Sequence, residues 1–255
     1  MDSKLFGFIP RKTIDDPNAA ENRIEVDKFL RYVYMYQLGI IRKICEESLA
    51  YGDILEIGAA GGITKSVWPE VITTDVREAA GVDKAMSAEM LEFENDSLKC
   101  IFGMDALHHV RDPETHFNEV SRCLATGGVA IYIEPNWNFF SKFSFGVALK
   151  YLHPEPYDLN SKGWRLLDDD PMMGNQAQGY NIFVRDELEF NYKFPRLQIE
   201  VMQPVKGLSF LLSGGVHTRL PIPSSFLLPI FKSEEKSPKW MKTFGLGRVI
   251  RVTKV

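Results

Sequence analysis

Two neighbouring histidines and one glutamate stand at the ends of predicted strands, where side chains can do chemistry. His108 and His109 follow a strand predicted at 98–104, and Glu134 lies near the end of a strand predicted at 129–135. Histidine titrates near neutral pH, so one of them could take a proton from a hydroxyl, and a carboxylate beside it would raise its basicity. Because parallel strands bring their carboxyl ends to one crevice, we expect His108 and Glu134 to lie close together.

Simpler roles for these side chains stay open. Either histidine could pack beneath a loop, and Glu134 could cap a helix or lie at the surface. His153 is a second candidate for the base, and His116 lies in a predicted helix, where we expect it to face solvent. No His, Cys and acidic residues have the spacing of a metal site along the chain, so we expect chemistry without a metal ion.

A turn of small residues follows the first predicted strand and reads Glu56-Ile57-Gly58-Ala59-Ala60-Gly61-Gly62. Such a turn lets the backbone approach a ligand, as the sites for dinucleotides and for S-adenosylmethionine require. The glycines do not follow G-x-G-x-x-G, so the fit to a dinucleotide site is poor. The pattern acid-x-Gly-x-x-x-Gly does fit, and a carboxylate suits the cationic S-adenosylmethionine. A tight turn without a ligand is the plainer alternative.

These residues need a scaffold of alternating strands and helices. Most predicted strands are apolar throughout and alternate with helical segments, which indicates a parallel sheet that is covered on both faces. A helical pattern spans 20–50, and another helix follows Asp112-Pro113. Strands are predicted at 54–57, 71–75, 82–86, 98–104 and 129–135, with returning strands at 197–205 and 248–255.

The stretch from Ile54 to Pro135 resembles the class I S-adenosylmethionine-dependent methyltransferases, most closely the type 11 branch. The matching residues are, in order, Ser87-Ala88-x-x-Leu91-Glu92-Phe93, Ser97-Leu98-Lys99, Leu107-His108-His109-Val110, Arg122-Cys123-Leu124-x-x-Gly127-Gly128 and Glu134-Pro135. Ser87 replaces an Asp that is usual in the family, Lys99 replaces another, and Ala60 replaces a common Gly. The resemblance implies an α/β, Rossmann-like fold: a mostly parallel seven-stranded sheet with helices on both faces, plus a lid inserted after the fifth strand.

By this resemblance, the strand ends bind S-adenosylmethionine, and S-adenosylhomocysteine is the product. Glu56 would orient loop amides near the methionine amino group, Asp75 would hold the ribose hydroxyls, and Met104 would offer its backbone carbonyl to the amino group. The remaining cofactor contacts are expected at Gly58, Ala59, Ala60, Gly62, Val76, Ser87 and Ala88.

The segment 136–196 is expected to form short helices that fold over the sheet edge and bind the acceptor. Its aromatic, amide and charged side chains suit a polyhydroxylated ligand, although an irregular lid could use the same groups to satisfy its own backbone. The segment also resembles a subgroup associated with bacterial surface-polysaccharide and glycolipid genes. The expected acceptor-binding residues are His109, Glu155, Tyr157, Trp164, Asn175, Gln176 and Arg185.

Length and composition bound the other possibilities. The 255 residues suit one domain, 1–255, divided into a helical region 20–50, a cofactor-binding core 52–135, the lid 136–196, and strands with an apolar arm 197–255. The formal net charge of −4 argues against nucleic acid as a partner. Three scattered cysteines and no secretory signal favour a reduced, cytoplasmic protein. The apolar residues of 220–231 could touch the inner face of a membrane, a second subunit or the protein's own core, and the sequence indicates no oligomeric state.

The leading expectation is therefore an O-methyltransferase that acts on a sugar hydroxyl of a saccharide or glycolipid. A methyltransferase for quinones, polyketides or other small molecules would share the core and differ in the lid. A scaffold that binds S-adenosylmethionine without catalysis is a third alternative. An oxidoreductase is disfavoured by the missing dinucleotide pattern.

Overall fold

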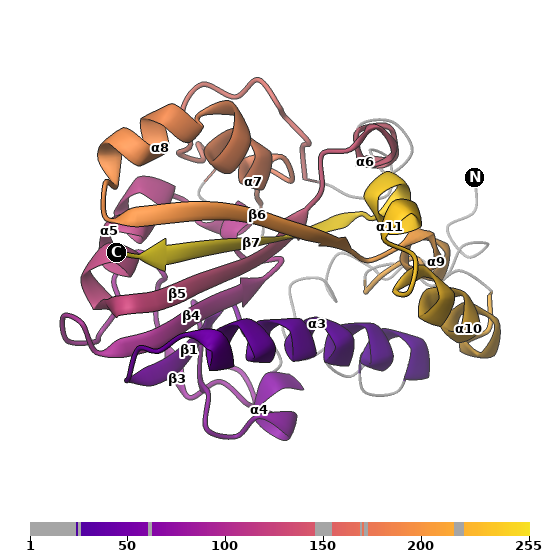
Figure 1. Ribbon diagram of the computed structural model, residues 1–255, viewed down its shortest axis with the longest axis horizontal. Coiled ribbons are helices and arrows are strands. Elements are labelled where there is room, and N and C mark those ends of the chain that lie inside the picture. The colour runs from indigo at the N-terminus through magenta and orange to yellow at the C-terminus, as the bar shows by residue number, and fades with distance from the viewer. Residues whose placement is uncertain are drawn as a thin grey trace.

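A single sheet of seven strands organises the molecule (Figure 1). The computed structural model describes residues 24, 27–60, 63–145, 155–168, 170, 173–216 and 222–255. The strand order is β3-β2-β1-β4-β5-β7-β6, and β7 runs in the direction opposite to the other six strands. This confirms the predicted fold class. The strands are β1 (Asp53–Ile57), β2 (Ile72–Asp75), β3 (Lys84–Ala85), β4 (Leu98–Met104), β5 (Leu124–Pro135), β6 (Leu197–Val205) and β7 (Gly247–Lys254).

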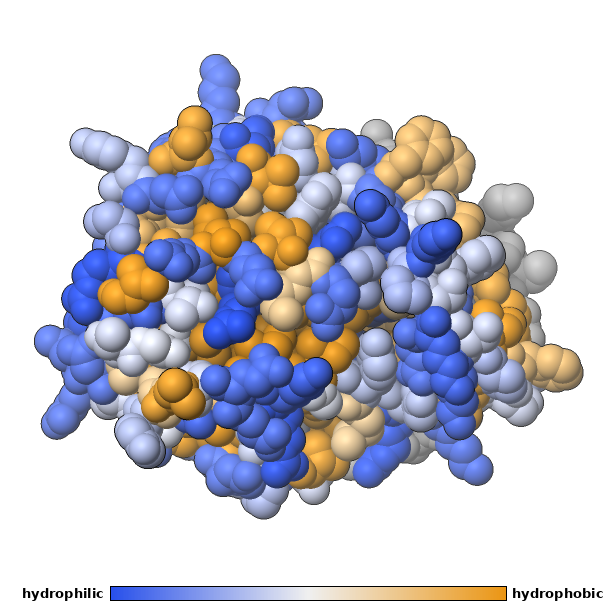
Figure 2. Space-filling model, in the orientation of Figure 1, coloured by the Kyte–Doolittle hydropathy of each residue, from blue (hydrophilic) through white to orange (hydrophobic). Residues whose placement is uncertain are grey.

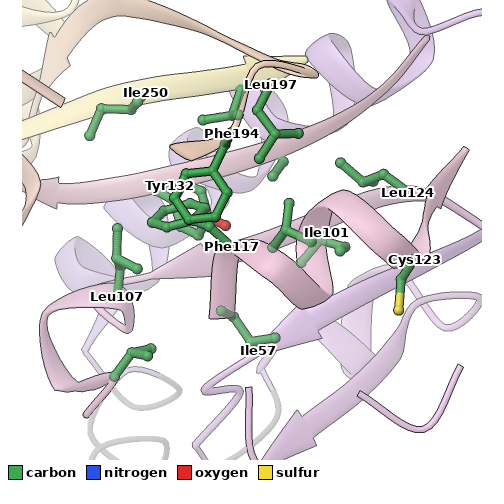
Figure 3. Close-up of a cluster of buried hydrophobic side chains, with 14 of the residues drawn as sticks. Ile57, Ile101, Leu107, Phe117, Cys123, Leu124, Tyr132, Phe194, Leu197 and Ile250 are labelled. Carbon is green, nitrogen blue, oxygen red and sulfur yellow. The ribbon is translucent and has the colours of Figure 1, made fainter. Parts of the chain in front are cut away.

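The two central strands are buried on both faces, as parallel strands must be when helices cover the sheet. Ile101 and Phe102 are neighbours on β4, yet they belong to separate apolar clusters, because successive strand residues point to opposite faces. Figure 3 shows one cluster, in which Phe117, Tyr132 and Phe194 pack together. The sheet therefore divides one hydrophobic core into two layers.

The long helix α3 (Lys28–Glu47) covers one face, and α5 (Pro113–Cys123) and α8 (Glu187–Lys193) cover the other (Figure 1). Asp27 caps α3 by accepting hydrogen bonds from the amides of Phe29 and Leu30. The shorter elements are α4 (Ile63–Val67), η2 (Leu107–His109), α6 (Phe139–Phe143), α7 (Gln178–Tyr180), the π-helix η4 (Asn181–Arg185), α9 (Leu208–Ser213), α10 (Ser224–Glu234) and α11 (Pro238–Phe244).

The register of the strands brings the candidate residues to one edge. Glu56 of β1 lies opposite Phe102 of β4, and Met104 lies opposite Ile133 of β5. Glu134 follows Ile133 directly. The ends of β1, β4 and β5 therefore open onto the same edge of the sheet, as expected for strands that run parallel.

The expectation that His116 faces solvent is wrong, because the side chain is fully buried. Its Nδ1 lies 2.8 Å from the carbonyl oxygen of Ala88, and its Nε2 lies 2.8 Å from the hydroxyl of Tyr132. Burial lowers the pKa of His116 to about 4, although the hydrogen bond to Ala88 and the Glu119 carboxylate oppose this change. The sequence could not show this role, because the helix position alone does not reveal a buried partner.

His116 should make the fold sensitive to acid. Its pKa is about 4 when folded and about 6.5 when unfolded, so unfolding takes up a proton between these pH values. Its contribution to stability is present above pH 6.5 and is lost as the pH falls toward 4, at about 3 kcal/mol in total. We expect urea midpoints of the wild type to fall more steeply between pH 7 and pH 4 than those of His116→Asn. Parallel pH curves for the two proteins would contradict this assignment.

Candidate functional site

The small-residue turn after β1 is packed too tightly for larger side chains. Gly58 has a positive φ of 65°, and a Cβ at this position would lie 2.7 Å from the Cβ of Ala106 in the loop after β4. Ala60 also has a positive φ, 45°, and its amide donates to Asp75 Oδ2 at 3.1 Å. The amide of Ala59 donates to the carbonyl of Thr74 at 2.9 Å. The turn is therefore held between β2 and the loop after β4.

Glu56 is a buried carboxyl group with one oxygen left to use. Its Oε1 accepts a hydrogen bond from Thr64 Oγ1 at 2.9 Å, whereas its Oε2 has no hydrogen-bond partner within the described part of the chain. Burial raises the pKa of Glu56 to about 8, the Thr64 hydrogen bond lowers it, and the Asp75 carboxylate raises it further. An ammonium group placed at Oε2 would satisfy this oxygen and favour the ionised form. The residue therefore fits the amino group of a methionine moiety.

Asp75 lies at the end of β2 and is 7% exposed. Its two oxygens accept hydrogen bonds from the amides of Ala60 and Arg77, at 3.1 Å each, which fixes the carboxylate at the rim of the turn. A carboxylate accepts about four hydrogen bonds, so it keeps acceptor capacity for two ribose hydroxyls. Val76 follows and is 55% exposed, so an apolar surface lies beside the carboxylate where adenine is expected.

The other expected cofactor residues lie around this turn. Ser87 is half-buried in the loop after β3, and its Oγ accepts a hydrogen bond from the amide of Glu89 at 3.1 Å. Ala88 is half-buried beside it and offers its carbonyl to His116. Met104 ends β4 and is partly buried against the apolar cluster of α3. Gly62 lies outside the described residues.

His108 and Glu134 meet as the strand-end argument predicts. The Nδ1 atom of His108 lies 2.6 Å from Glu134 Oε2, and both side chains are buried. The other oxygen of Glu134 accepts hydrogen bonds from the amides of Ala106, at 3.2 Å, and Leu107, at 2.8 Å. Glu134 therefore both orients the imidazole and caps the short helix η2 that carries it.

The lid brings a second carboxylate to the other side of the imidazole. Glu155 Oε2 lies 3.4 Å from His108 Nε2 and 3.9 Å from His109 Nε2. Gln176 donates from Nε2 to Glu155 Oε2 at 2.8 Å, and the same Nε2 lies 3.4 Å from His108 Nε2. Gly174 lets the lid come this close, because a Cβ there would overlap the carbonyl of His108. Glu134, His109, Glu155 and Gln176 thus gather around the imidazole of His108.

These carboxylates decide the charge of His108. Burial alone would lower the pKa of the imidazole, but Glu134, Glu155 and Asp105 together raise it to about 9. At neutral pH the imidazole therefore holds a proton. A role as base requires that this proton first leave Nε2, because Nδ1 is committed to Glu134.

Three residues that were expected to contact the acceptor have their partners within the lid, so their contact with the acceptor stays a prediction. Trp164 is a core residue whose Nε1 donates to Asp186 at 2.9 Å. Arg185 bonds to Asp186 and to the carbonyl of Leu159, and Asn175 bonds to the backbone of Asp158 and Ala177. These side chains hold the lid together. The composition of the lid showed their polarity, but not that their partners lie within the lid itself.

The remaining candidates for acceptor contact fall into two groups: one supports the lid, and the others lie near His108. Tyr157 donates its hydroxyl to the carbonyl of Asn136 at 2.9 Å, and its ring stacks on Phe145 at 5.5 Å, so it supports the lid. Glu155, Gln176 and His109 are the candidates that reach His108. His153 lies outside the described residues.

Sequence reasoning missed a partly buried ion pair at the same edge. Lys206, which is 5% exposed, pairs with Asp105 directly after β4. Both residues have a positive φ, 56° and 53°, so each backbone turns sharply at this contact. An acid directly after a predicted strand was the available signal for Asp105, whereas Lys206 lies 101 residues further along the chain.

Replacing Asp75 should weaken binding of S-adenosylmethionine. A charge-assisted hydrogen bond contributes about 1.5–3 kcal/mol, so losing those to the ribose should raise the Kd by at least about tenfold in Asp75→Ala. Calorimetric titration measures this directly. Asp75→Asn keeps one acceptor oxygen and should fall between the two proteins. Equal Kd values for Asp75→Ala and the wild type would remove this residue from the cofactor site.

The comparisons with known proteins agree with this geometry. Residues 55–132 match the model of a family described as a methyltransferase domain. No curated protein matches the chain.

Among solved structures, a S-adenosylmethionine-dependent methyltransferase from Thermotoga maritima, a possible histamine N-methyltransferase, has a TM-score of 0.54 at 17% identity, over 97% of this chain and 100% of that one. The YcgJ protein of Bacillus subtilis has a TM-score of 0.47 at 16% identity, over 84% of this chain and 97% of that one. Phosphoethanolamine N-methyltransferase 2 of Haemonchus contortus has a TM-score of 0.44 at 15% identity, over 86% of this chain and 52% of that one.

The first of these likenesses shows the fold, and the family match covers the strands and loops that carry Glu56, Asp75 and His108. Residues 55–132 therefore form a methyltransferase domain that uses S-adenosylmethionine, and the chain that carries it is a S-adenosylmethionine-dependent methyltransferase with the class I fold.

Proposed function

We propose that this methyltransferase transfers the methyl group to a hydroxyl of a saccharide or glycolipid. The observation that carries the proposal is the cluster of His108, His109, Glu155 and Gln176, in which the Glu155 carboxylate lies 2.8 Å from the Gln176 amide and 3.4 and 3.9 Å from the imidazoles of His108 and His109. The cluster is joined to the cofactor turn through the packing of Ala106 against Gly58. Such side chains recognise hydroxyl groups.

The positions of Trp164 and Tyr157 favour a polar acceptor over a flat apolar ring. A quinone or a polyketide ring would need exposed aromatic or aliphatic faces beside the cofactor. Trp164 is buried in the core, and the hydroxyl of Tyr157 is held by Asn136. The polar groups of Glu155 and Gln176 are what the lid places against His108 instead.

In this reaction the protein mainly has to align the acceptor with the methyl group and to move one proton. When bound, S-adenosylmethionine would supply the methyl group from its sulfonium, and the protein would hold the acceptor oxygen in line with that methyl group. Glu56 and Asp75 would hold the amino and ribose groups. Glu155 and Gln176 would position the acceptor. His108 Nε2, the nitrogen that Glu134 leaves available, would first release its own proton to Glu155 Oε2 at 3.4 Å and would then accept the hydroxyl proton.

The activity should appear as an ether product. We expect labelled methyl groups from S-adenosylmethionine to enter soluble or lipid-linked saccharides, in a bond that resists mild alkali, as an ether does and an ester does not. His108→Ala should lower turnover by about 10²–10⁴, the usual range for a proton-transfer residue, and leave the Kd of the cofactor nearly unchanged.

His116→Asn is the matched control, because this histidine is also buried but lies outside the cluster. Unchanged turnover in His108→Ala together with its collapse in His153→Ala would move the role to His153. Transfer to catechols or quinols and to no saccharide would favour the alternative, a small-molecule methyltransferase for apolar rings.

The apolar arm has one buried and one exposed side. Leu227 and Phe231 of α10 pack against Phe29 of α3, which places this side of the arm in the protein's own core. On the other side, Phe226 is 67% exposed and Ile230 is also exposed. None of the described helices is long and apolar enough to cross a membrane. The side of α10 that carries Phe226 and Ile230 is exposed, so it can contact a membrane surface or another protein.

Basic side chains accompany this apolar side. α11 is joined to α10 by a hydrogen bond from Trp240 to Glu234 at 3.1 Å, and α6 is joined to α11 by Phe140 and Phe244, whose rings lie 5.2 Å apart. The end of the molecule that carries these helices presents hydrophobic and hydrophilic residues side by side (Figures 1 and 2). The exposed residues there include Phe139, Phe143, Phe226, Ile230 and Trp240, and the lysines 142, 232, 236, 239 and 242.

We propose that this end rests on an anionic membrane surface, at the inner face, where a lipid-linked saccharide would be presented. Lysines attract anionic head groups, and aromatic side chains enter the interface. We expect the protein to float with vesicles of phosphatidylcholine and phosphatidylglycerol, and not with phosphatidylcholine alone. Added salt should weaken binding by screening the charges.

Phe226→Ser should lose most of this binding. Leu188→Ser is the matched control, because Leu188 is 87% exposed on α8. Equal binding of Phe226→Ser and the wild type would contradict the assignment. A dimer that Phe226→Ser dissociates in sedimentation would instead assign this side to a second copy.

A further inference from the structure

We propose that His108, His109 and Glu155 bind a divalent transition-metal ion. This goes beyond the proposed methyl transfer and departs from the expectation, drawn from residue spacing, that no metal is needed. The three residues each offer one ligand atom, and these atoms all lie within 4.8 Å of one another. They come from the loop after β4 and from the lid, which meet only in the folded chain.

The distances are close to those of a metal site. Glu155 Oε2 lies 3.4 Å from His108 Nε2 and 3.9 Å from His109 Nε2. A tetrahedral ion with bonds of about 2.0–2.2 Å holds its ligand atoms roughly 3.3–3.6 Å apart. Two of the three separations are thus within about 0.3 Å of this range, and an ion would need to draw the three atoms slightly closer together.

The donor set selects the class of ion. Two imidazole nitrogens and one carboxylate oxygen are typical ligands of zinc and of other divalent first-row metals. Magnesium and calcium prefer sites made of oxygen atoms alone. The site is therefore of the zinc class, and magnesium should not compete for it.

The contacts around the ligands are already those of a metal centre. Metal-binding histidines usually donate their second ring nitrogen to a carboxylate, which fixes the ring and directs the other nitrogen at the ion. Glu134 holds His108 Nδ1 in this way at 2.6 Å, and is itself fixed by the amides of Ala106 and Leu107. Gln176 holds the Glu155 carboxylate at 2.8 Å.

Access is open on one side. The side chains of His108 and Glu155 are 3% and 7% exposed, whereas that of His109 is 25% exposed. Three protein ligands leave at least one coordination position for water or for an incoming oxygen. With the ion bound, His108 Nε2 would be a ligand and would take no proton. If the proposed function holds, a hydroxyl of the acceptor would then occupy the open position, where the ion would lower its pKa and its proton would pass to solvent.

Calorimetry can test the site without any acceptor, so its failure would be separate from failure of the proposed function. Untagged protein, freed of metal by a chelator that is then removed, would be titrated with Zn²⁺ and in parallel with Mg²⁺. We expect one Zn²⁺ per chain and no Mg²⁺ binding. Glu155→Gln and His109→Asn should each weaken Zn²⁺ binding at least tenfold, and His116→Asn, the control, should leave it unchanged.

Glu134→Gln tests the supporting contact. It keeps the shape of the side chain but weakens its hold on His108, so Zn²⁺ affinity should fall about 10–100-fold, as for other residues that orient metal ligands. Absence of Zn²⁺ binding by the wild type would overturn the proposal. So would Zn²⁺ binding that Glu155→Gln and His109→Asn leave unchanged. Visible absorption of the Co²⁺-loaded wild type, which needs no variant, should show nitrogen and oxygen ligation, and a spectrum of hydrated Co²⁺ would also overturn it.

Discussion

The bond between Glu134 and His108 is the contact on which the rest of the site depends. A buried carboxylate is costly unless each oxygen has a partner, and here two backbone amides and one imidazole satisfy it. Those amides belong to the loop that also presses Ala106 against Gly58. One side chain at the end of β5 therefore sets the helix η2, the direction of His108 Nε2 and the position of the cofactor turn. Removing its charge would loosen all three together.

The two carboxyl groups of the cofactor side differ because their surroundings differ. Glu56 is buried with one hydroxyl donor, and its pKa rises to about 8. Asp75 is also buried, but two amides hold its oxygens and the Nε of Arg77 lies 3.6 Å away. Glu56, whose Oε2 has no partner among the described residues, is poised to accept a cation, whereas Asp75 is already oriented to accept hydroxyl groups. Because β1 lies next to β2, both carboxyl groups lie beside the turn of small residues that follows β1.

The sequence predicted the sheet well because its strands are apolar runs with clear ends. The segments 98–104 and 197–205 became strands with the same bounds, and the meeting of His108 with Glu134 followed from strand direction alone. The contacts of the lid were harder to predict, because its polar residues could face a ligand or each other. Trp164 and Arg185 both hydrogen-bond to Asp186 within the lid. The pairing of Asp105 with Lys206, and the convergence of Glu155 on two histidines, join distant segments through tertiary packing that no local pattern records.

The tight packing of Gly58 against Ala106 also bears on how this enzyme can change over evolutionary time. A larger side chain at either position would push the cofactor turn away from the loop that carries His108. The two positions are thus tied to each other as a small-residue pair. The described part of the lid contacts the same loop through Glu155 and Gln176, and through backbone hydrogen bonds of Asn175 to His108 and of Leu166 to Arg111. Substitutions elsewhere in the lid can therefore change the acceptor during evolution, while the residues that hold S-adenosylmethionine stay the same.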